Sequence, residues 1–431
     1  MAVLTTVRLA AVGAGFLTSV LAARVLGTSQ LGAAGVALTI GAIAALVANG
    51  GLNIASTYFL GRRPHERRVI AHRVLTLGLA ASLLAAALVL FVVRPFADRI
   101  FDQDALALVS ATAVLAAGIV GFEVGGAILL GLDRRKPYVI TQVIEGLGSF
   151  VLTAAIFVFV SPTAEGMVIA AGLAFLVAAL FAASVAQRTV GGWIFGFDAR
   201  FTREALALGL RGQAGNILQF LNLRLDLLLV PLLMDLRAAG LYLIAVRMSE
   251  VVTQTASAAA AFLFPAVSRS GVNQTELTER TMRVTLIVVI AAGAAIALAG
   301  EVLLETFFGP QFGAATGALR ITMFAMVPLS ISRLLAGDMK GRGRAGLVSI
   351  SAATALIATL LLDLLLIPRY GIEGAAVASL LAYSAGAATL LAAYTRVTGA
   401  PLRRLIPTMA DVATIASVVR RLAPGDRARR P

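Results

Sequence analysis

The chain has 431 residues, of which 59% are hydrophobic and only 13% are charged. A soluble domain is typically about half apolar and about a quarter charged, and it keeps a polar surface that this composition does not supply. These values exclude a water-soluble enzyme and predict a polytopic membrane protein. Cysteine is absent and neither of the two lysines precedes Ser or Thr, which excludes thiol chemistry and a P-loop. We expect no metal and no cofactor.

Twelve apolar runs are long enough to cross a bilayer as a helix, which takes about 20 residues. Helices are expected because lipid offers no partner for unpaired backbone groups, and the runs lack the period-two alternation of a β-barrel. The predicted spans, with approximate ends, are 4–26, 31–60, 73–93, 105–131, 138–160, 166–186, 206–234, 238–267, 282–300, 314–338, 346–367 and 372–395.

The 36 basic residues alternate in density from one gap between spans to the next. If the N-terminus is cytoplasmic, 26 of them fall on the cytoplasmic side, 5 on the opposite side and 5 within spans. This is the distribution that the positive-inside rule requires. The sequence therefore predicts an all-α, multi-pass protein of the cytoplasmic membrane with both termini in the cytoplasm.

The longest polar interval divides the spans into two groups of six. Three short patterns recur between the groups at offsets of 205 to 208 residues, and the clearest is Leu31-x-Ala33-Ala34-Gly35 against Leu236-x-Ala238-Ala239-Gly240. An even number of spans gives both copies the same orientation, so we expect a parallel repeat with the substrate path between the halves. The predicted parts are an N-terminal half at 1–190, a cytoplasmic linker at 191–204, a C-terminal half at 205–396 and a basic cytoplasmic tail at 397–431.

Three segments carry a resemblance to a known family. They are AARVLGTSQLGAAGVALTI at Ala22 to Ile40, LRLDLLLVPLLMDLRAAGLYLIAV at Leu223 to Val246, and IPRYGIEGAAVASLLAY at Ile367 to Tyr383. They resemble the Wzx-type polysaccharide-biosynthesis flippases of the multidrug/oligosaccharidyl-lipid/polysaccharide exporter superfamily.

The resemblance implies a bacterial transporter, not an enzyme. Its implied activity is translocation of undecaprenyl-pyrophosphate-linked oligosaccharide from the inner to the outer leaflet by alternating access, for surface or exopolysaccharide synthesis. The implied partners are this lipid-linked substrate, membrane lipid, and a polysaccharide polymerase with its chain-length machinery; no nucleic acid is expected.

The seventh predicted span is the most polar. At 100° per residue, Gln219, Asn222 and Asp226 share one face, whereas Arg224 lies about 160° from Asp226. Since a charge in the membrane costs at least about 2.5 kcal/mol, these residues are candidates for a substrate cavity. Each charge then needs a partner from another helix. The alternative is that they join helices through hydrogen bonds.

Other polar groups extend the candidate site. Arg247 and Glu250 are three residues apart in the eighth span and form either a cavity pair or a self-neutralising pair. Asn49-Gly50-Gly51 interrupts the second span, where an unwound turn would expose backbone groups to a cavity. Its Asn49, with the nearby Asn53, joins the candidate set.

Three intramembrane carboxylates are candidates for ion coupling. Glu123 and Glu145 have no opposite charge nearby in sequence, so each is either protonated by burial or paired with an arginine of another helix. Asp226 is the third coupling candidate. Proton or sodium coupling through such groups also fits the alternative function, a multidrug or cation antiporter of the same superfamily.

Several remaining features favour structural roles. We expect Arg24 to anchor the first span at the interface, and Arg333 to extend toward the cytoplasmic side. Gly121-xxx-Gly125 predicts close helix packing within the chain. The basic residues from Arg62 to Arg73 are a topology signal or a recruitment site for a phosphorylated headgroup.

Overall fold

The computed structural model describes residues 2–101, 105–192, 196–268, 274–409 and 411–412, and their side chains from residue 13 onward. Within these ranges every regular element is a helix, as predicted, and ten helices are long and apolar enough to cross a membrane. The α-helices are α1 (Ala2–Asn49), α2 (Leu52–Arg62), α3 (Arg67–Leu88), α4 (Ala97–Ile100), α5 (Ala105–Gly131), α6 (Arg135–Phe159), α7 (Ala164–Val190), α8 (Ala199–Leu233), α9 (Leu236–Val267), α10 (Gln274–Leu298), α11 (Gly300–Phe308), α12 (Thr316–Gly341) and α13 (Ala345–Thr398).

Short turns of other helix types join some of these elements. A π-helical turn follows α3 at Val89–Val93, and 3-10 turns occupy Pro64–Glu66, Arg94–Phe96, Pro310–Ala315 and Leu402–Leu405. Of the predicted basic tail at 397–431, residues 410 and 413–431 lie outside the described part of the chain.

The two longest helices each contain one glycine with a non-helical backbone. Gly27 in α1 has φ 72° and ψ −175°, and Gly371 in α13 has φ 59° and ψ −141°. Both lie where the sequence predicts a gap between spans. Positive φ is readily adopted only by glycine, so each long helix is two helical pieces joined at a predicted boundary. The count of twelve spans remains a prediction.

The chain forms two compact units. The first comprises Met1–Leu243 with Glu305–Phe312, and the second comprises Ile244–Leu304 with Gly313–Pro431. These units are defined by contacts within the fold. The predicted halves on either side of residues 191–204 are defined by a sequence repeat, and that division stays a prediction.

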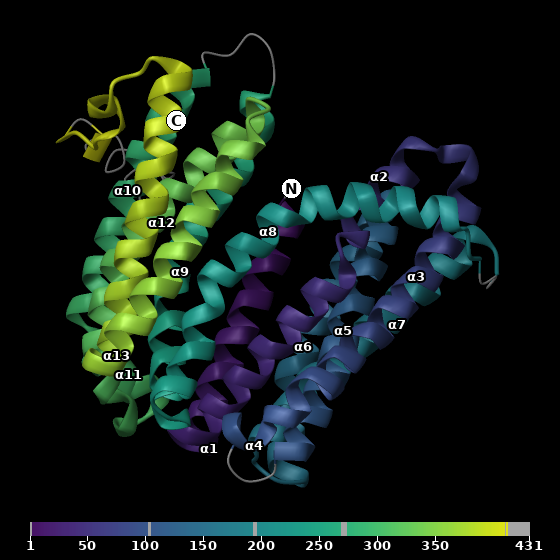
Figure 1. Ribbon diagram of the computed structural model, residues 1–431, viewed down its shortest axis with the longest axis horizontal. Helices are drawn as coiled ribbons and strands as arrows, with labels where there is room; N and C mark the ends of the chain where they lie inside the picture. Colours follow the sequence, from purple (N-terminus) through teal and green to yellow (C-terminus); the bar gives the residue numbers. More distant parts are fainter. Residues whose placement is uncertain (1, 102–104, 193–195, 269–273, 410, 413–431) are drawn as a thin grey trace, which may run out of the picture. The chain divides into compact units, whose positions relative to one another are not determined.

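Helix α5 is the centre of the first unit, where it packs against α1, α2, α3 and α7 (Figure 1). Small residues allow its close approach to α7. A Cβ atom built on Gly121 would lie 3.1 Å from Cβ of Ala179, and one on Gly125 would lie 2.8 Å from Cβ of Ala182. The predicted use of Gly121-xxx-Gly125 for packing within the chain is confirmed.

In the second unit α12 packs between α10 and α13. Its core joins side chains of α9, α10, α12 and α13, including Leu263, Met282, Leu334 and Tyr394. Dispersion and the close fit of such side chains hold helices together in a bilayer, where lipid tails are as apolar as the core.

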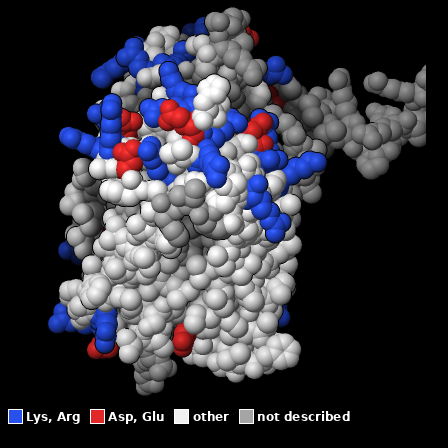
Figure 2. Space-filling model, turned by 90° about the vertical axis from the view of Figure 1, so that its right-hand side faces the viewer, with Lys and Arg blue, Asp and Glu red and all other residues white. Residues whose placement is uncertain are grey.

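The outward faces of the helices are apolar. Leu180 in α7 is 69% exposed and Leu361 in α13 is 63% exposed. An exposed apolar surface of this extent marks a membrane-facing protein. On the face shown in Figure 2, Lys and Arg gather toward one end above a broad uncharged surface.

Candidate functional site

The candidate site of the first unit is built on a break between two helices. Helix α1 ends at Asn49 and α2 begins at Leu52, and the intervening Gly50 and Gly51 have φ values of 52° and 79°. A Cβ atom on Gly209 of α8 would lie 2.7 Å from the carbonyl oxygen of Gly51, so α8 crosses the break in direct backbone contact. The predicted interruption of the second span is confirmed.

The break places two amides beside a carboxylate of α5. The Asn49 side chain donates a hydrogen bond through Nδ2 to Oε2 of Glu123, and Nδ2 of Asn53 lies 3.5 Å from the same oxygen. Asn49 is almost fully buried. The contacts of the Glu123 carboxylate are therefore the side-chain amides of Asn49 and Asn53, where an arginine of another helix was one of the two expectations.

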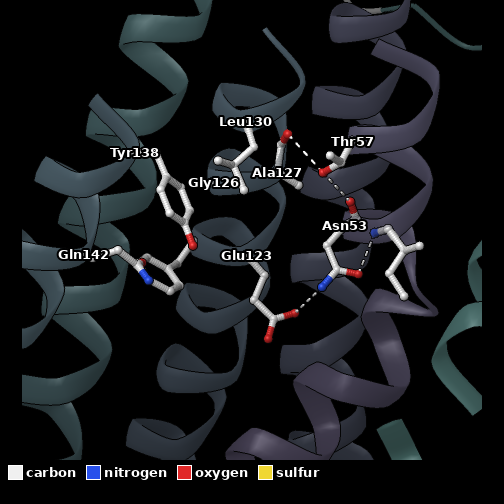
Figure 3. A pocket seen from close by; sticks show the side chains of 10 residues that line it. Asn53, Thr57, Glu123, Gly126, Ala127, Leu130, Tyr138 and Gln142 are labelled. Atoms are coloured by element: carbon white, nitrogen blue, oxygen red, sulfur yellow. Dashed lines mark hydrogen bonds between the residues drawn. The ribbon is translucent and has the colours of Figure 1, made fainter. Parts of the chain in front are cut away.

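A pocket of about 310 Å³ opens beside this carboxylate. Figure 3 shows Asn53 and Thr57 of α2 on one side, Tyr138 and Gln142 of α6 on the other, and Glu123 of α5 between them. Thr57 donates to the carbonyl of Ala127 at 3.3 Å. The lining combines a carboxylate, amides, hydroxyls and an aromatic ring, which suits a polar, uncharged or cationic group.

Tyr138 and Gln142 were not among the predicted site residues. Their spacing of four places both on one stripe of α6, and Glu145, three residues further, continues that stripe. A search for polar residues at helical spacing would have found them. Glu145 itself makes no hydrogen bond or ion pair with the described residues.

Asp226 of α8 is the most buried of the predicted charged site residues, with 1% of its surface exposed. The hydroxyl of Tyr242 in α9 donates to its Oδ2 at 2.6 Å. One partner of Asp226 from another helix is thus a tyrosine. Asn222 is buried one turn before Asp226, and Gln219 is partly exposed.

The other predicted charged residues belong to different units. Arg224 is partly exposed on α8 in the first unit, whereas Arg247 and Glu250 are partly exposed on α9 in the second. Their assignment to a substrate cavity stays a prediction.

Two further arginines donate hydrogen bonds to oxygens of other helices. Arg24 donates through Nε to the carbonyl of Phe307 at 2.8 Å and through Nη2 to that of Thr306, at the end of α11. Cations are favoured there because the last carbonyls of a helix lack partners. Arg333 donates through Nη1 to the hydroxyls of Thr253 and Ser257 at 2.8 and 2.7 Å, so it joins α12 to α9. Its predicted reach toward the cytoplasmic side stays a prediction.

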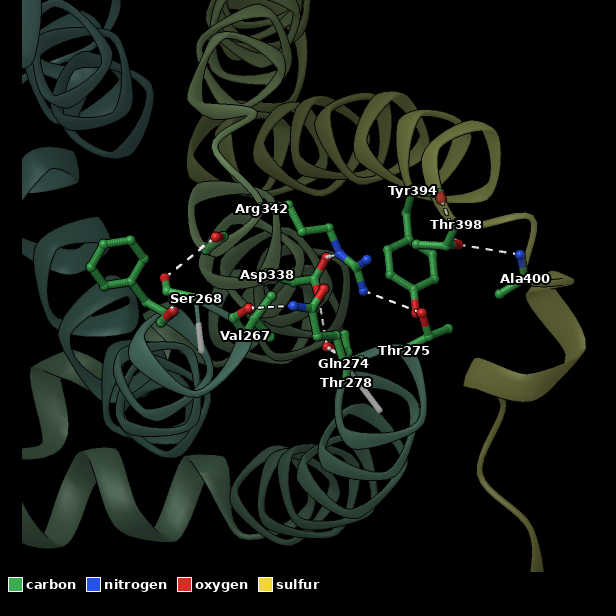
Figure 4. Close-up of polar contacts among 12 residues, drawn as sticks. Val267, Ser268, Gln274, Thr275, Thr278, Asp338, Arg342, Tyr394, Thr398 and Ala400 are labelled. Atoms are coloured by element: carbon green, nitrogen blue, oxygen red, sulfur yellow. Dashed lines mark hydrogen bonds and ion pairs between the residues drawn. The ribbon is translucent and has the colours of Figure 1, made fainter. Parts of the chain in front are cut away.

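A second polar cluster lies in the second unit (Figure 4). The fully buried carboxylate of Asp338 in α12 accepts from Thr278 of α10 at 2.7 Å and from Nε of Arg342 at 2.8 Å. Arg342 also donates to the Thr275 hydroxyl at 3.3 Å. These contacts hold the start of α10 against the end of α12.

Sequence reasoning also missed Asp363 of α13, which is fully buried. Its signal was available, since it is the one acidic residue in the apolar run TLLLDLLLIP. An acidic residue inside a membrane span is a candidate functional residue, so the reasoning applied to Glu123 and Glu145 would also have selected Asp363.

The fold is shared with known membrane transporters. The chain is similar to the structure of the lipid II flippase MurJ in an inward closed conformation, at 13% identity and a TM-score of 0.78, over 94% of this chain and 89% of that one. It is also similar to an inward-facing multidrug resistance MATE family transporter of the MOP superfamily, at 16% identity and a TM-score of 0.71, over 90% and 95% of the two chains. A MOP superfamily transporter from Pyrococcus furiosus matches at 18% identity and a TM-score of 0.57, over 92% and 93%. At these identities the likeness concerns the fold.

The ten long apolar helices and this fold are those of a multi-pass membrane protein. The family model for polysaccharide biosynthesis proteins matches residues 1–270. The chain belongs to that family, and the family predicted from its sequence is confirmed. No curated protein matches the chain by sequence.

Proposed function

We propose that the protein is a flippase that moves undecaprenyl-pyrophosphate-linked oligosaccharide from the inner to the outer leaflet of the bacterial cytoplasmic membrane. The observation that carries the proposal is the pocket at the break between α1 and α2. There Asn53, Tyr138, Gln142 and Glu123 present hydrogen-bonding groups among apolar helices. Its volume of about 310 Å³ lies at the small end of the range for ligand pockets, about 300–1,000 Å³.

The proposed layout is twelve spans in two parallel six-helix halves with cytoplasmic termini. The breaks at Gly27 and Gly371 support it, because they divide α1 and α13 where the sequence predicts gaps between spans. Alternating access between the halves would open the path to each leaflet in turn.

In this proposal the sugar and the pyrophosphate use different residues. The uncharged and acidic groups of the pocket take the sugar. Arg224 takes the phosphates, since the guanidinium fork can bind phosphate through two parallel hydrogen bonds. An inside-negative potential favours outward movement of the anionic headgroup by about 2.3 kcal/mol per charge per 100 mV.

The test is depletion of the protein in its host, followed by complementation with Glu123→Gln, Arg224→Ala or Asp226→Ala. Glu301→Gln, an exposed carboxylate on α11, is the matched control. We expect lipid-linked oligosaccharide to accumulate on the cytoplasmic leaflet in the first three strains and to clear in the control. Normal clearance in all strains, with lowered resistance to cationic drugs, would overturn the proposal.

One observation favours a second candidate, an ion-coupled cation antiporter. The one ionisable acid of the pocket, Glu123, has no arginine, lysine or histidine among the residues that line the pocket with it. A carboxylate in such surroundings suits a proton or a cation. In proteoliposomes, Glu123→Gln would then abolish the response of transport to a proton or sodium gradient while exchange without a gradient persists.

A further inference from the structure

A second, strongly basic pocket lies at the ends of the helices of the first unit. Its volume is about 590 Å³, and it is lined by three separate connections: the one between α2 and α3, the turn between α5 and α6, and the end of α7. Its charged lining consists of His65, Arg67, Arg68, Arg134 and Asp133.

The arginines of this pocket are not neutralised by neighbouring acids. Its one carboxylate, Asp133, pairs at 2.9 Å with Arg135, which lies outside the lining. Other acids of this end are paired with other arginines, as in Arg73 with Asp198 at 2.7 Å and Arg63 with Glu204 at 3.5 Å. Within the described residues, Arg67, Arg68 and Arg134 take part in no ion pair.

Two of these arginines have a structural role that leaves most of their donors available. Arg67 Nε donates to the carbonyl of Leu60 at 3.1 Å, near the end of α2, and Arg68 Nη2 donates to the carbonyl of Gly191 at 2.8 Å, just after α7. Such contacts satisfy carbonyls at helix ends. Because a guanidinium has five N–H donors, most donors of each side chain remain for a ligand.

We propose that this pocket binds a phosphate group, presented by the headgroup of an anionic membrane lipid or as free phosphate. Three guanidinium groups from two of these connections, Arg67 and Arg68 at the start of α3 and Arg134 in the turn between α5 and α6, match the several oxygens of a phosphate. The pocket also lies where apolar helices end, which is the depth of lipid headgroups. The proposal does not depend on the flippase function, and either can fail without the other.

The test compares two double variants of the full-length protein in detergent. Arg68→Gln with Arg134→Gln alters the pocket. Arg62→Gln with Arg203→Gln removes the same charge from exposed positions outside it. Native mass spectrometry measures binding of phosphatidylglycerol against phosphatidylcholine, and calorimetry measures binding of inorganic phosphate.

We expect the pocket variant to bind at least tenfold more weakly in one or both assays, while the control changes less than twofold. Loss of phosphatidylglycerol binding alone assigns the lipid headgroup, and loss of inorganic phosphate binding alone assigns free phosphate. Equal losses in the two variants, or no loss in either, would overturn the proposal. If the double variant does not fold, Arg134→Gln replaces it, because the Arg134 side chain makes no hydrogen bond or ion pair with the described residues.

Discussion

Gly32 of α1 and Gly240 of α9 face each other at backbone distance. A Cβ atom on Gly32 would lie 2.8 Å from the amide nitrogen of Gly240, and one on Gly240 would lie 3.1 Å from that of Gly32. Both glycines lie within the two copies of the Leu-x-Ala-Ala-Gly pattern. Gly32 is the second residue of the first copy, and Gly240 is the last residue of the second copy. The two copies of the pattern therefore pack on each other, which explains why both keep small residues.

This contact predicts opposite effects for two glycine substitutions. Gly240→Ala overfills the contact and should lower the stability of the protein by about 1–3 kcal/mol. Gly15→Ala in α1 meets nothing within 4 Å and should be neutral or stabilising by up to about 1 kcal/mol through helix propensity. Thermal unfolding in detergent measures both, and equal effects would contradict the contact.

The helix break at Gly50 and Gly51 gives a graded prediction. Alanine at either position would have to adopt the left-handed backbone conformation, which lowers stability by about 1–2 kcal/mol. At Gly51 the new Cβ also overlaps the backbone of Gly209, whereas at Gly50 its nearest neighbour is a side-chain carbon of Leu206 at 3.7 Å. Gly51→Ala should therefore lower the melting temperature clearly more than Gly50→Ala. The reverse order would show that α8 does not rest on the break.

The bond between Tyr242 and Asp226 predicts a coupled pair. Tyr242→Phe removes a 2.6 Å hydrogen bond to a buried carboxylate and should cost about 1.5–3 kcal/mol. In an Asp226→Asn background the same substitution should cost less, because the charged acceptor is gone. A double-mutant cycle on unfolding free energies measures the coupling. Additive effects would mean that the hydroxyl does not stabilise the carboxylate.

Much of this architecture could be predicted from the sequence, because its signals are local. Apolar runs predict the helices, and Asn49-Gly50-Gly51 predicts its break. The partner of Glu123 could not be predicted, since Asn49 is 74 positions away and no periodicity links the two. The partners of Arg333 could not be predicted for a related reason, because the hydroxyls of Thr253 and Ser257 on α9 lie 80 and 76 positions away in sequence.

The buried pair of Asp338 and Arg342 predicts a large effect in the second unit. Asp338→Ala leaves the Arg342 guanidinium, only 14% exposed, without its carboxylate and should cost about 3–5 kcal/mol. The matched control is Asp133→Ala, which breaks an exposed pair with Arg135 and should cost about 0–1 kcal/mol. Unfolding midpoints of both variants check the difference, and similar small losses would show that the buried cluster contributes little.

The start of α8 predicts a pH dependence with a defined sign. The pKa of Asp198 is held below its ordinary value of 3.8 by the backbone N–H of Phe201 and by the charge of Arg73. A lowered pKa stabilises the folded state above the unfolded pKa, and this contribution is lost as the pH falls through the folded pKa.

Asp198→Asn isolates that charge, since asparagine still serves as an N-cap. The difference in melting temperature between wild type and variant should be constant from about pH 5 to 8 and shrink as the pH falls below about 4. Differential scanning fluorimetry across this range measures it. A difference that grows toward low pH would contradict the predicted sign and show that the ionised carboxylate does not stabilise the start of α8.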